Sequence, residues 1–309
     1  AAQCALDLGD GSERAEYVNQ DYILHKLGRP HRAIGIMYTY YPHDKQWPQR
    51  ISKACKDMNI TFQWDYPYDD YFPFNADGQP WEQMRDIRRH GQDVALTLTL
   101  DCSLSDDELR EVARMLRPYG RMTIRINHEC GGTWFTHNKR FTYEQVGKFF
   151  AHFSDIIHQE APNVRTVFCA GFAQADGKLE KEDEFAVAYR AADVWSADCY
   201  LALHYGWPYD VAEVGGGQYK ADSVGMYYDM FRRTYERASS QFGAKPLVTA
   251  EFNTDGDVTG PRHQGESVIR FAETFRDHKA DWFKAISLYQ FRDRGRLGLE
   301  IEDPNNPAV

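Results

Sequence analysis

Short apolar runs recur along the chain, each about as long as a β-strand. Amphipathic stripes with the period of an α-helix separate several of them, and capping boxes at Ser105/Glu108 and Thr142/Gln145 mark two helix starts. We expect the apolar face of each helix to pack against a sheet. The eight runs predicted to be strands are Ala33–Tyr40, Ile60–Asp65, Asp93–Asp101, Arg121–His128, Val164–Phe172, Val194–Leu201, Pro246–Glu251 and Lys284–Gln290.

The alternation of strands and helices predicts a parallel sheet, and eight such units in 309 residues predict an α/β fold closed as a (β/α)8 TIM barrel. An open doubly wound sheet is the alternative. Against it, the first run continues into Tyr38-Thr39-Tyr40-Tyr41-Pro42, with no G-x-G-x-x-G turn. We therefore expect one catalytic domain over residues 1–309, with the barrel at about 33–291, an N-terminal extension at 1–32 and a C-terminal tail at 292–309.

The charge balance narrows the possible partners. The chain has 36 lysines and arginines against 46 aspartates and glutamates, a formal net charge of −10, which disfavours nucleic acid and anionic membrane surfaces. No apolar run approaches the roughly 20 residues that cross a bilayer. The chain starts at Ala1 without a methionine, which a cleaved leader or a trimmed chain would explain, and we expect a secreted or otherwise extracytoplasmic protein.

The six cysteines lack the close pairs typical of metal sites. Four of them, Cys102, Cys130, Cys169 and Cys199, fall in or beside predicted strands and are expected to be buried free thiols. The other two, Cys4 and Cys55, are candidates for a disulfide if the protein is exported.

Acidic and aromatic side chains gather where predicted strands end, and (β/α)8 barrels hold their reactive groups at that end. Glu129 follows the fourth predicted strand and Glu251 ends the seventh. Strands four and seven face each other across a barrel mouth, so we expect the two carboxyl groups to meet. Cleavage of a glycosidic bond requires such a pair, one protonated to release the leaving oxygen and one ionised to attack or to activate water. Glu129 and Glu251 are therefore the candidate catalytic residues.

Other reactive motifs fail at a required position. His128-Glu129 would begin a zinc-binding H-E-x-x-H, but Gly132 stands where the second histidine is needed. The segment from Glu251 resembles the start of a calcium loop, but Arg262 replaces its closing glutamate. No G-x-S-x-G elbow is present. We therefore expect neither a metal nor a cofactor.

The residues around Glu129 resemble the strand-four motif of glycoside hydrolase family 26, R-x-x-H-E-x-x-G-x-W-F, which belongs to a clan of retaining (β/α)8 glycosidases and includes β-mannanases. The matching residues are Arg125, His128, Glu129, Gly132, Trp134 and Phe135. Two shorter segments are similar to that family's strand-six D-x-Y and strand-seven E-F, namely Asp198-Cys199-Tyr200 and Glu251-Phe252. The chain departs from the family pattern at Thr136-His137-Asn138, at Asn253 and at Tyr289-Gln290-Phe291-Arg292.

The resemblance implies a retaining mechanism with Glu129 as acid/base, its pKa raised, and Glu251 as nucleophile, hydrogen-bonded by Tyr200. The substrate is expected to be a β-linked polysaccharide of the mannan, mixed-linkage glucan or xylan type, and aromatic candidates spread over several loops favour internal cleavage. The alternative is a carbohydrate-binding barrel without turnover. Arg125 is expected to pair with a buried acid such as Asp101, or to hold the catalytic carboxylates charged. The candidate substrate-binding residues are His128, Trp134, Tyr200, Arg125, Trp64, Trp207 and Tyr289.

Overall fold

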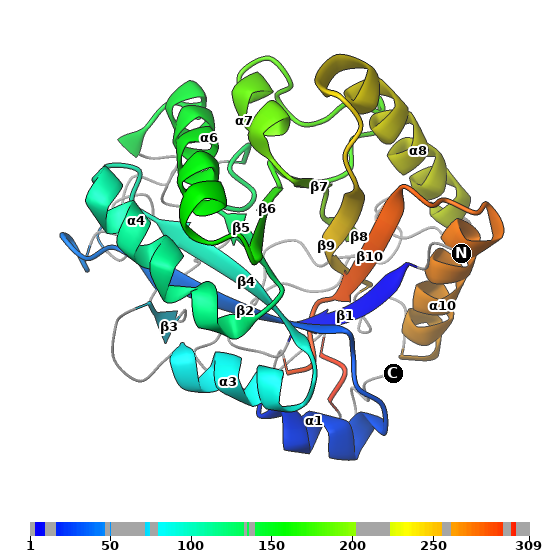
Figure 1. Ribbon diagram of the computed structural model, residues 1–309. Coiled ribbons are helices and arrows are strands. Elements are labelled where there is room, and N and C mark those ends of the chain that lie inside the picture. Colours follow the sequence, from blue (N-terminus) through cyan, green and yellow to red (C-terminus); the bar gives the residue numbers. More distant parts are fainter. Residues whose placement is uncertain are drawn as a thin grey trace.

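Eight parallel strands form a closed barrel, and helices surround it (Figure 1). The computed structural model describes residues 4–9, 17–46, 50, 72–74, 80–132, 135, 140–201, 223–254, 261–292 and 298–300. Strand β1 pairs with both β2 and β10 and so closes the sheet. The barrel strands are β1 (Ala5–Gly9), β2 (Ala33–Tyr40), β4 (Asp93–Leu100), β5 (Met122–Ile126), β6 (Val164–Phe168), β7 (Val194–Ser196), β9 (Leu247–Asn253) and β10 (Phe283–Leu288). The predicted (β/α)8 TIM barrel is confirmed.

Two short strands extend this barrel. Strand β3 (Phe72–Pro73) pairs with the end of β2. Strand β8 (Cys199–Tyr200) follows β7 and pairs with the end of β9. Because β8 runs beside the last residues of β9, it brings the segment after the sixth barrel strand next to Glu251.

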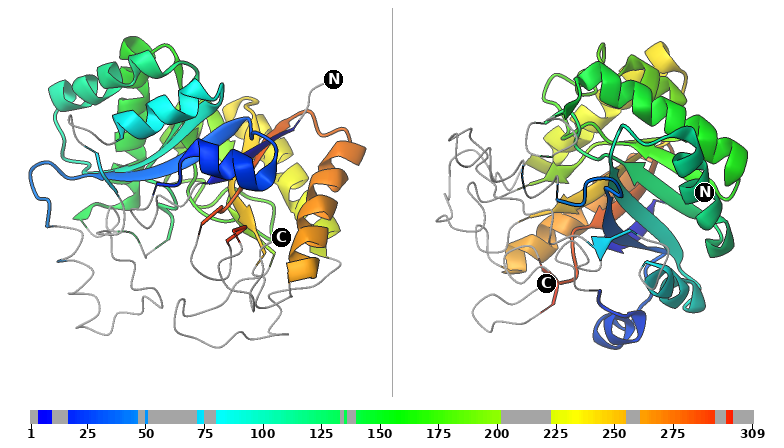
Figure 2. Two further views of the ribbon diagram at one scale, coloured as in Figure 1. Left: turned by 90° about the horizontal axis from the view of Figure 1, so that it is seen from below. Right: turned by 90° about the vertical axis from the view of Figure 1, so that its left-hand side faces the viewer.

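Helices pack against the outer face of the strands, as the side views in Figure 2 also show. They are α1 (Gln20–Leu27), α3 (Trp81–Arg89), α4 (Asp106–Met115), the 3-10 helix η3 (Arg117–Tyr119), α6 (Tyr143–Glu160), α7 (Ala186–Ala191), α8 (Ser223–Phe242) and α10 (Pro261–Asp277). The capping box predicted at Thr142/Gln145 is complete, whereas at Ser105 only the side-chain hydrogen bond from the Glu108 N–H is present. None of the helices described is both long and apolar enough to span a membrane.

The main hydrophobic core lies between the barrel and the helices. The outward face of β2 contributes Ile34, Ile36 and Tyr38 to it, each fully buried. Helix α6 supplies Phe150, whose ring lies 4.7 Å from that of Phe168 on β6. The alternation of side chains along each strand therefore separates an apolar outer face from an inner face that carries small and polar residues.

The first barrel strand lies in the segment 1–32, so the predicted barrel boundary at residue 33 is wrong. Strand β1 has only five residues, and Asp7 occupies an inward position on it, where it forms an ion pair with Arg32. A short run with a buried acid does not have the apolar pattern of a strand. The predicted strand Ile60–Asp65 lies outside the described residues. Strands β5 and β9 are nevertheless the fourth and seventh of the barrel, as predicted.

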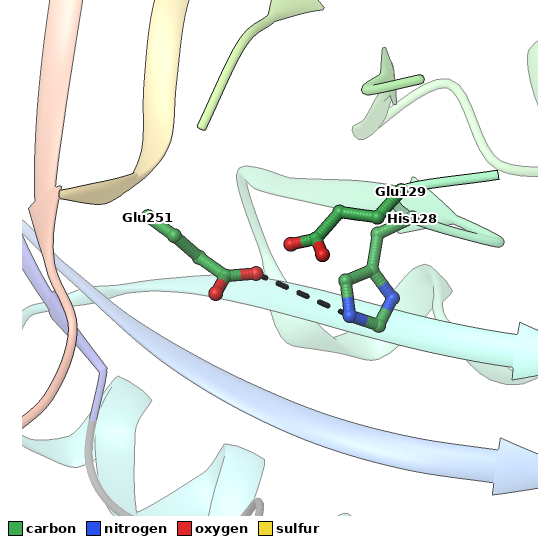
Figure 3. Close-up of side chains that lie close together, drawn as sticks. All are labelled: His128, Glu129 and Glu251. Carbon is green, nitrogen blue, oxygen red and sulfur yellow. Dashed lines mark ion pairs between the residues drawn. The ribbon is translucent and has the colours of Figure 1, made fainter. Parts of the chain in front are cut away.

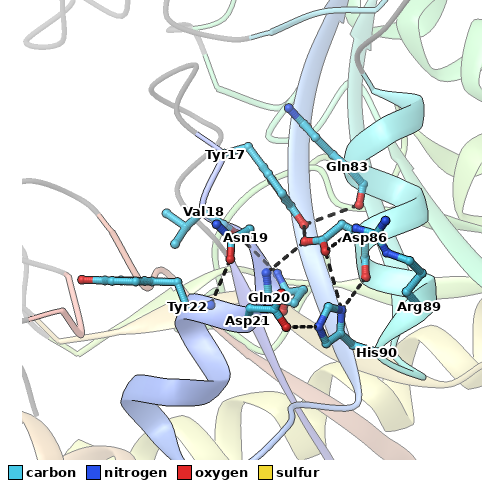
Figure 4. A network of polar contacts seen from close by, with 10 residues as sticks. All are labelled: Tyr17, Val18, Asn19, Gln20, Asp21, Tyr22, Gln83, Asp86, Arg89 and His90. Carbon is cyan, nitrogen blue, oxygen red and sulfur yellow. Dashed lines mark hydrogen bonds and ion pairs between the residues drawn. The ribbon is translucent and has the colours of Figure 1, made fainter.

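A polar network ties this N-terminal segment to α3 (Figure 4). The Asp86 carboxylate accepts hydrogen bonds from the Tyr17 hydroxyl at 2.5 Å and from the Gln20 backbone N–H at 2.9 Å. His90 contacts the Asp86 carbonyl and the Asp21 carboxylate, each at 2.7 Å. These contacts hold α1, and with it the connection between β1 and β2, against the barrel.

Three of the cysteines predicted to be buried are so, namely Cys130, Cys169 and Cys199, and Cys102 is half-buried. All four are free thiols. Cys55 lies outside the described residues, so its pairing with Cys4 stays a prediction.

Candidate active site

Glu129 lies in a turn that follows β5 at the carboxyl end of the barrel. The backbone of Asn127 and Glu129 has positive φ angles of 47° and 54°, a conformation that costs a residue with a side chain about 1–2 kcal/mol. Hydrogen bonds to both neighbouring strand ends hold it. The Asn127 carboxamide oxygen accepts from the Leu100 N–H at 2.9 Å, and the Glu129 N–H donates to the Cys169 carbonyl at 2.8 Å. The direction of the Glu129 side chain is therefore set by backbone contacts on two sides.

The next turn residue, Gly131, allows the close approach of the neighbouring strand end. Its N–H donates to the Ala170 carbonyl at 2.7 Å. A Cβ atom at this position would lie only 2.8 Å from the same carbonyl oxygen. A glycine is therefore required for the turn to close onto the end of β6.

Glu251 lies on β9 itself, near its carboxyl end, and is held from two sides. The Tyr200 hydroxyl donates a hydrogen bond to Glu251 Oε1 at 2.8 Å, and Arg125 Nη2 forms an ion pair with Oε2 at 2.8 Å. The Arg125 side chain is itself buried, at 6% exposed. The hydrogen bond expected from Tyr200 is thus present, and the Glu251 carboxylate has a fixed orientation.

The two glutamates point toward each other from opposite sides of the barrel mouth, with His128 beside them (Figure 3). One carboxylate oxygen of Glu129, one of Glu251 and a ring nitrogen of His128 all lie within 4.8 Å of one another. His128 Nε2 is 4.0 Å from Glu251 Oε2. The expectation that these two carboxyl groups, far apart in the chain, meet at one site is therefore confirmed.

Arg125 holds together two carboxylates beneath the site. Besides Glu251, its guanidinium pairs with Asp198 at 3.3 Å, and its Nε donates to the Thr97 hydroxyl at 3.0 Å. Burial alone would lower the pKa of Arg125, but the charges of Glu251 and Asp198 raise it well above its ordinary value. Arg125 therefore stays a cation. Of the two interpretations offered for it, pairing with Asp101 is wrong, because Asp101 turns back to its own loop and pairs with Arg140.

The carboxyl group of Glu129 is set up to keep its proton. Burial, the charge of Glu251 and a hydrogen bond with Asp198 raise the pKa of Glu129 well above its ordinary value. Burial and the neighbouring charges also raise the pKa of Asp198. A hydrogen bond between two carboxyl groups requires that one of them be protonated. The site therefore stores one proton between Glu129 and Asp198, as like charges in a buried site do.

No known family profile matches the sequence, and no curated protein matches it. Solved structures do match the fold. A GH26 β-mannanase from Bacteroides ovatus aligns with a TM-score of 0.53 and 10% identity, over 100% of this chain and 84% of that chain. A family 39 glycoside hydrolase from Bacteroides cellulosilyticus aligns with a TM-score of 0.57 and 9% identity, over 96% and 60%. This chain therefore spans less than two thirds of the length of the family 39 protein.

A third match is the GH53 catalytic domain from Ignisphaera aggregans, with a TM-score of 0.51 and 12% identity, over 92% of this chain and 79% of that chain. Identities this low show the fold alone. The matched structures are glycoside hydrolases of several families, so the comparison shows the barrel fold and does not single out family 26.

The structure brings together most of the candidate site residues that it describes. His128 is 1% exposed, and its ring packs on that of Phe135 at 4.4 Å. Tyr289 follows β10 and packs edge-on against Tyr200, with ring centroids 6.2 Å apart. These two residues thus line the same site as Glu129 and Glu251. The candidate aromatic platforms Trp64, Trp134 and Trp207 lie outside the described residues.

The structure adds two residues to the site: Asp198, which the sequence analysis quoted without giving it a role, and Thr97, which it did not name. Asp198 is completely buried and contacts both Arg125 and Glu129. The D-x-Y segment marked its position, but both partners come from β5 and the turn that follows it, which no local pattern reveals. Thr97 sits at an inward position of β4 beside Arg125, and a single buried threonine gives no sequence signal.

Within the described residues, His128, Glu129 and Glu251 form a group whose atoms could contact one metal ion. One nitrogen and two carboxylate oxygens suit a transition metal. However, the Arg125 guanidinium already pairs with Glu251 at 2.8 Å and places a fixed positive charge at the site. The arrangement fits a proton-transferring pair better than a metal centre.

Proposed function

We propose that the protein is a retaining glycoside hydrolase that cleaves a β-linked glycan. One observation carries the proposal: one carboxylate oxygen of Glu129 and one of Glu251 lie within 4.8 Å of each other across the barrel mouth. Retaining glycosidases place their two carboxyl groups roughly 5–5.5 Å apart, whereas inverting enzymes need roughly 6.5–9.5 Å to admit a water molecule. The barrel fold shared with several glycoside hydrolase families supports the same function.

In the first step, a Glu251 oxygen attacks the anomeric carbon while the Glu129 carboxyl group gives its proton to the leaving glycosidic oxygen. The bond to the leaving group breaks and a glycosyl ester of Glu251 forms. In the second step, Glu129, now ionised, takes a proton from water, and that water displaces Glu251. The donors Tyr200 and Arg125 hold the Glu251 carboxylate in a fixed orientation. Asp198 keeps the proton on Glu129 before the first step.

The proposed substrate class rests on the candidate aromatic residues, which lie outside the described residues, and on His128 and Tyr289 beside Glu129 and Glu251. Stacking of sugar rings on the aromatic candidates, with His128 and Tyr289 as direct contacts, suits an extended glycan that is cut internally. A matched family 26 enzyme is a β-mannanase, and a matched GH5 enzyme has been solved with a cellotriose. We therefore propose mannan, mixed-linkage glucan or xylan as the substrate, and action outside the cytoplasm, where such polymers occur.

The test is hydrolysis of a panel of these three polysaccharides, followed as reducing ends, with the anomeric form of the first product read by proton NMR. The expected result is new reducing ends on at least one polymer with the β-anomer formed first. An α-anomer as the first product would contradict the double displacement. Binding without any product on the whole panel would favour a carbohydrate-binding barrel instead. A 2-fluoro glycoside of the active sugar should trap an adduct on Glu251, detectable by peptide mass.

A further inference from the structure

The interior of the barrel contains a cavity of about 360 Å³, to which all eight barrel strands contribute. Barrel interiors are ordinarily filled by bulky branched side chains. Here many inward positions hold glycine, alanine or serine, which leave the space open: they include Gly9, Gly35, Ala95, Ala250, Ala285 and Ser287. The volume falls within the roughly 300–1,000 Å³ that small-molecule sites occupy.

The cavity opens at the end of the barrel opposite to the catalytic pair. Two of its lining residues near the amino-terminal strand ends are exposed, namely Arg32, whose side chain is 43% exposed, and Lys284. At the other end it is closed by residues that are at most 8% exposed, Arg125, Tyr289 and Gln290. The cavity is thus closed at its top, beneath the side chains that hold Glu251, and is a site distinct from the barrel mouth.

The walls of the cavity and its opening differ in chemistry. Met37, Val167 and Val248 provide aliphatic walls. Two cations, Arg32 and Lys284, line the opening. Arg32 is paired with Asp7, whereas Lys284 has no carboxylate partner among the residues that the structure describes. An open cation is therefore available at the end of a largely apolar tunnel.

Further positive charge surrounds this opening. Arg165 lies on the same face of β6 as Val167, two residues nearer the amino-terminal end. Its guanidinium donates to the Pro162 carbonyl at 3.1 Å, and the Lys245 ammonium donates to two carbonyls. Arg165 thus donates to backbone oxygens, whereas Lys245 also lies near the charge of Asp193. Arg165 therefore adds to the positive charge of Arg32 and Lys284 at this end of a chain whose net charge is −10.

We propose that the barrel interior binds a linear amphipathic anion, an alkyl chain with a carboxylate head group, with the tail inside the barrel and the head at Lys284. The tail displaces water from aliphatic walls, and the head remains at the solvent-exposed opening, where its charge does not have to be buried. This site goes beyond the proposed function and does not depend on it, because Arg125 and Tyr289 are the only cavity-lining residues that are also candidate glycan contacts.

The experiment is calorimetric titration of the full chain at low salt with butanoate, hexanoate and octanoate. If the tail enters the barrel, affinity should rise about fourfold for each added methylene. Octanol, which lacks the charge, should bind more weakly than octanoate. Equal affinity for all three acids would mean that only the head group binds at the surface, and would overturn the proposal, as would the absence of octanoate binding.

Two variants localise the site. Ala95→Leu fills the cavity and should weaken octanoate binding at least tenfold, while the surface substitution Val187→Leu should not change it. Lys284→Gln should weaken binding roughly two- to fivefold, the effect of one partly exposed ion pair, with Lys148→Gln on α6 as the control of equal charge. Should Ala95→Leu fail to fold by circular dichroism, Ala285→Val fills the same space. Unchanged octanoate binding in a folded filled variant would exclude the barrel interior. Hydrolysis is not measured, so this outcome is independent of the catalytic test.

Discussion

Each end of this barrel holds a cluster of acidic and basic side chains, with acids in excess at one end and arginines in excess at the other. At the carboxyl end, three acids (Glu129, Asp198 and Glu251) surround the single cation Arg125. At the amino-terminal end, Asp7 and Asp93 meet three arginines: Arg32 contacts both acids, and Arg88 and Arg121 pair with Asp93 at 2.9 and 2.7 Å. An excess of acid in a buried site keeps a proton bound, whereas the arginines at the other end oppose the negative charge of the acids that they pair with.

The carboxyl-end cluster has the features of a functional site, whereas the amino-terminal cluster stabilises the barrel. The carboxyl end retains a repulsion that a stability-optimised cluster would not keep, and strained or repulsive arrangements of this kind are characteristic of functional sites. At the amino-terminal end the arginines, partly exposed, lock the starts of β2, β4 and β5 together. Substitutions at the two ends should therefore affect different measurements.

The largest effect is expected from the catalytic pair. Glu251→Gln and Glu129→Gln should each lower kcat/KM on the active polymer by roughly a thousandfold or more, because one removes the proposed nucleophile and the other the proposed proton donor. Reducing-end assays measure the loss, and circular dichroism checks the fold.

Asp93→Asn is the matched control from the other end of the barrel. It also removes one buried carboxylate charge, but it should leave kcat/KM within about twofold. A loss of activity in Asp93→Asn as large as in the glutamate variants would show that the two ends are not functionally separate. Near-normal activity in either glutamate variant would remove that residue from the mechanism.

The next effect concerns the proton stored between Glu129 and Asp198. Asp198→Asn removes a negative charge that raises the pKa of Glu129, so the acid form of Glu129 should be lost at a lower pH. The alkaline limb of the kcat/KM profile should then move to lower pH. At a fixed pH above this limb, the variant should be about tenfold less active than the wild type for each pH unit of that shift. If the alkaline limb stays at the same pH and only the maximal kcat/KM falls, Asp198 positions Arg125 and does not raise the pKa of Glu129.

Most of the barrel strands and the positions of Glu129 and Glu251 could be predicted from the sequence, because each is marked by a pattern in its own neighbouring residues. Glu129 and Glu251 stand at the ends of clear apolar runs, and the period of two identifies β5 and β9 directly. Strand β1 was missed because it has five residues and an inward acid, so only its pairing with β2 and β10 makes it a strand. A strand whose stability comes from its neighbours leaves little pattern in its own residues.

The partners within the site were harder to predict than its members. Arg125 was identified, yet its contact with Asp198 depends on the closeness of β5 to the segment that follows β7, which is a property of the closed barrel. The same holds for the cavity. Each small inward residue is unremarkable by itself, and the space appears only when eight strands bring these residues together.

A smaller effect is expected for Asp93 on stability. Asp93→Ala should lower the free energy of unfolding by about 2 kcal/mol, since it leaves Arg88 and Arg121 without their acid at the start of β4. Both arginines are more exposed than Asp93, which limits the loss to less than that of a fully buried pair. Chemical denaturation at pH 7 measures it. Stability equal to that of the wild type would show that the amino-terminal network is dispensable.

The smallest effect is expected for Asp7, and it depends on pH. Burial raises the pKa of Asp7 to about 6, although Arg32 opposes this change. The folded protein therefore binds this proton more tightly than the unfolded chain does, so the stabilisation is complete below about pH 4 and is lost as pH rises through about 6. Asp7→Asn removes this dependence. At pH 7 the variant should be about 1 kcal/mol more stable, because relief of the buried charge exceeds the lost contact with Arg32. At pH 4 the two proteins should differ little in denaturant midpoint. If Asp7→Asn instead loses stability relative to the wild type between pH 4 and pH 7, the ion pair with Arg32 outweighs the cost of burying the Asp7 charge.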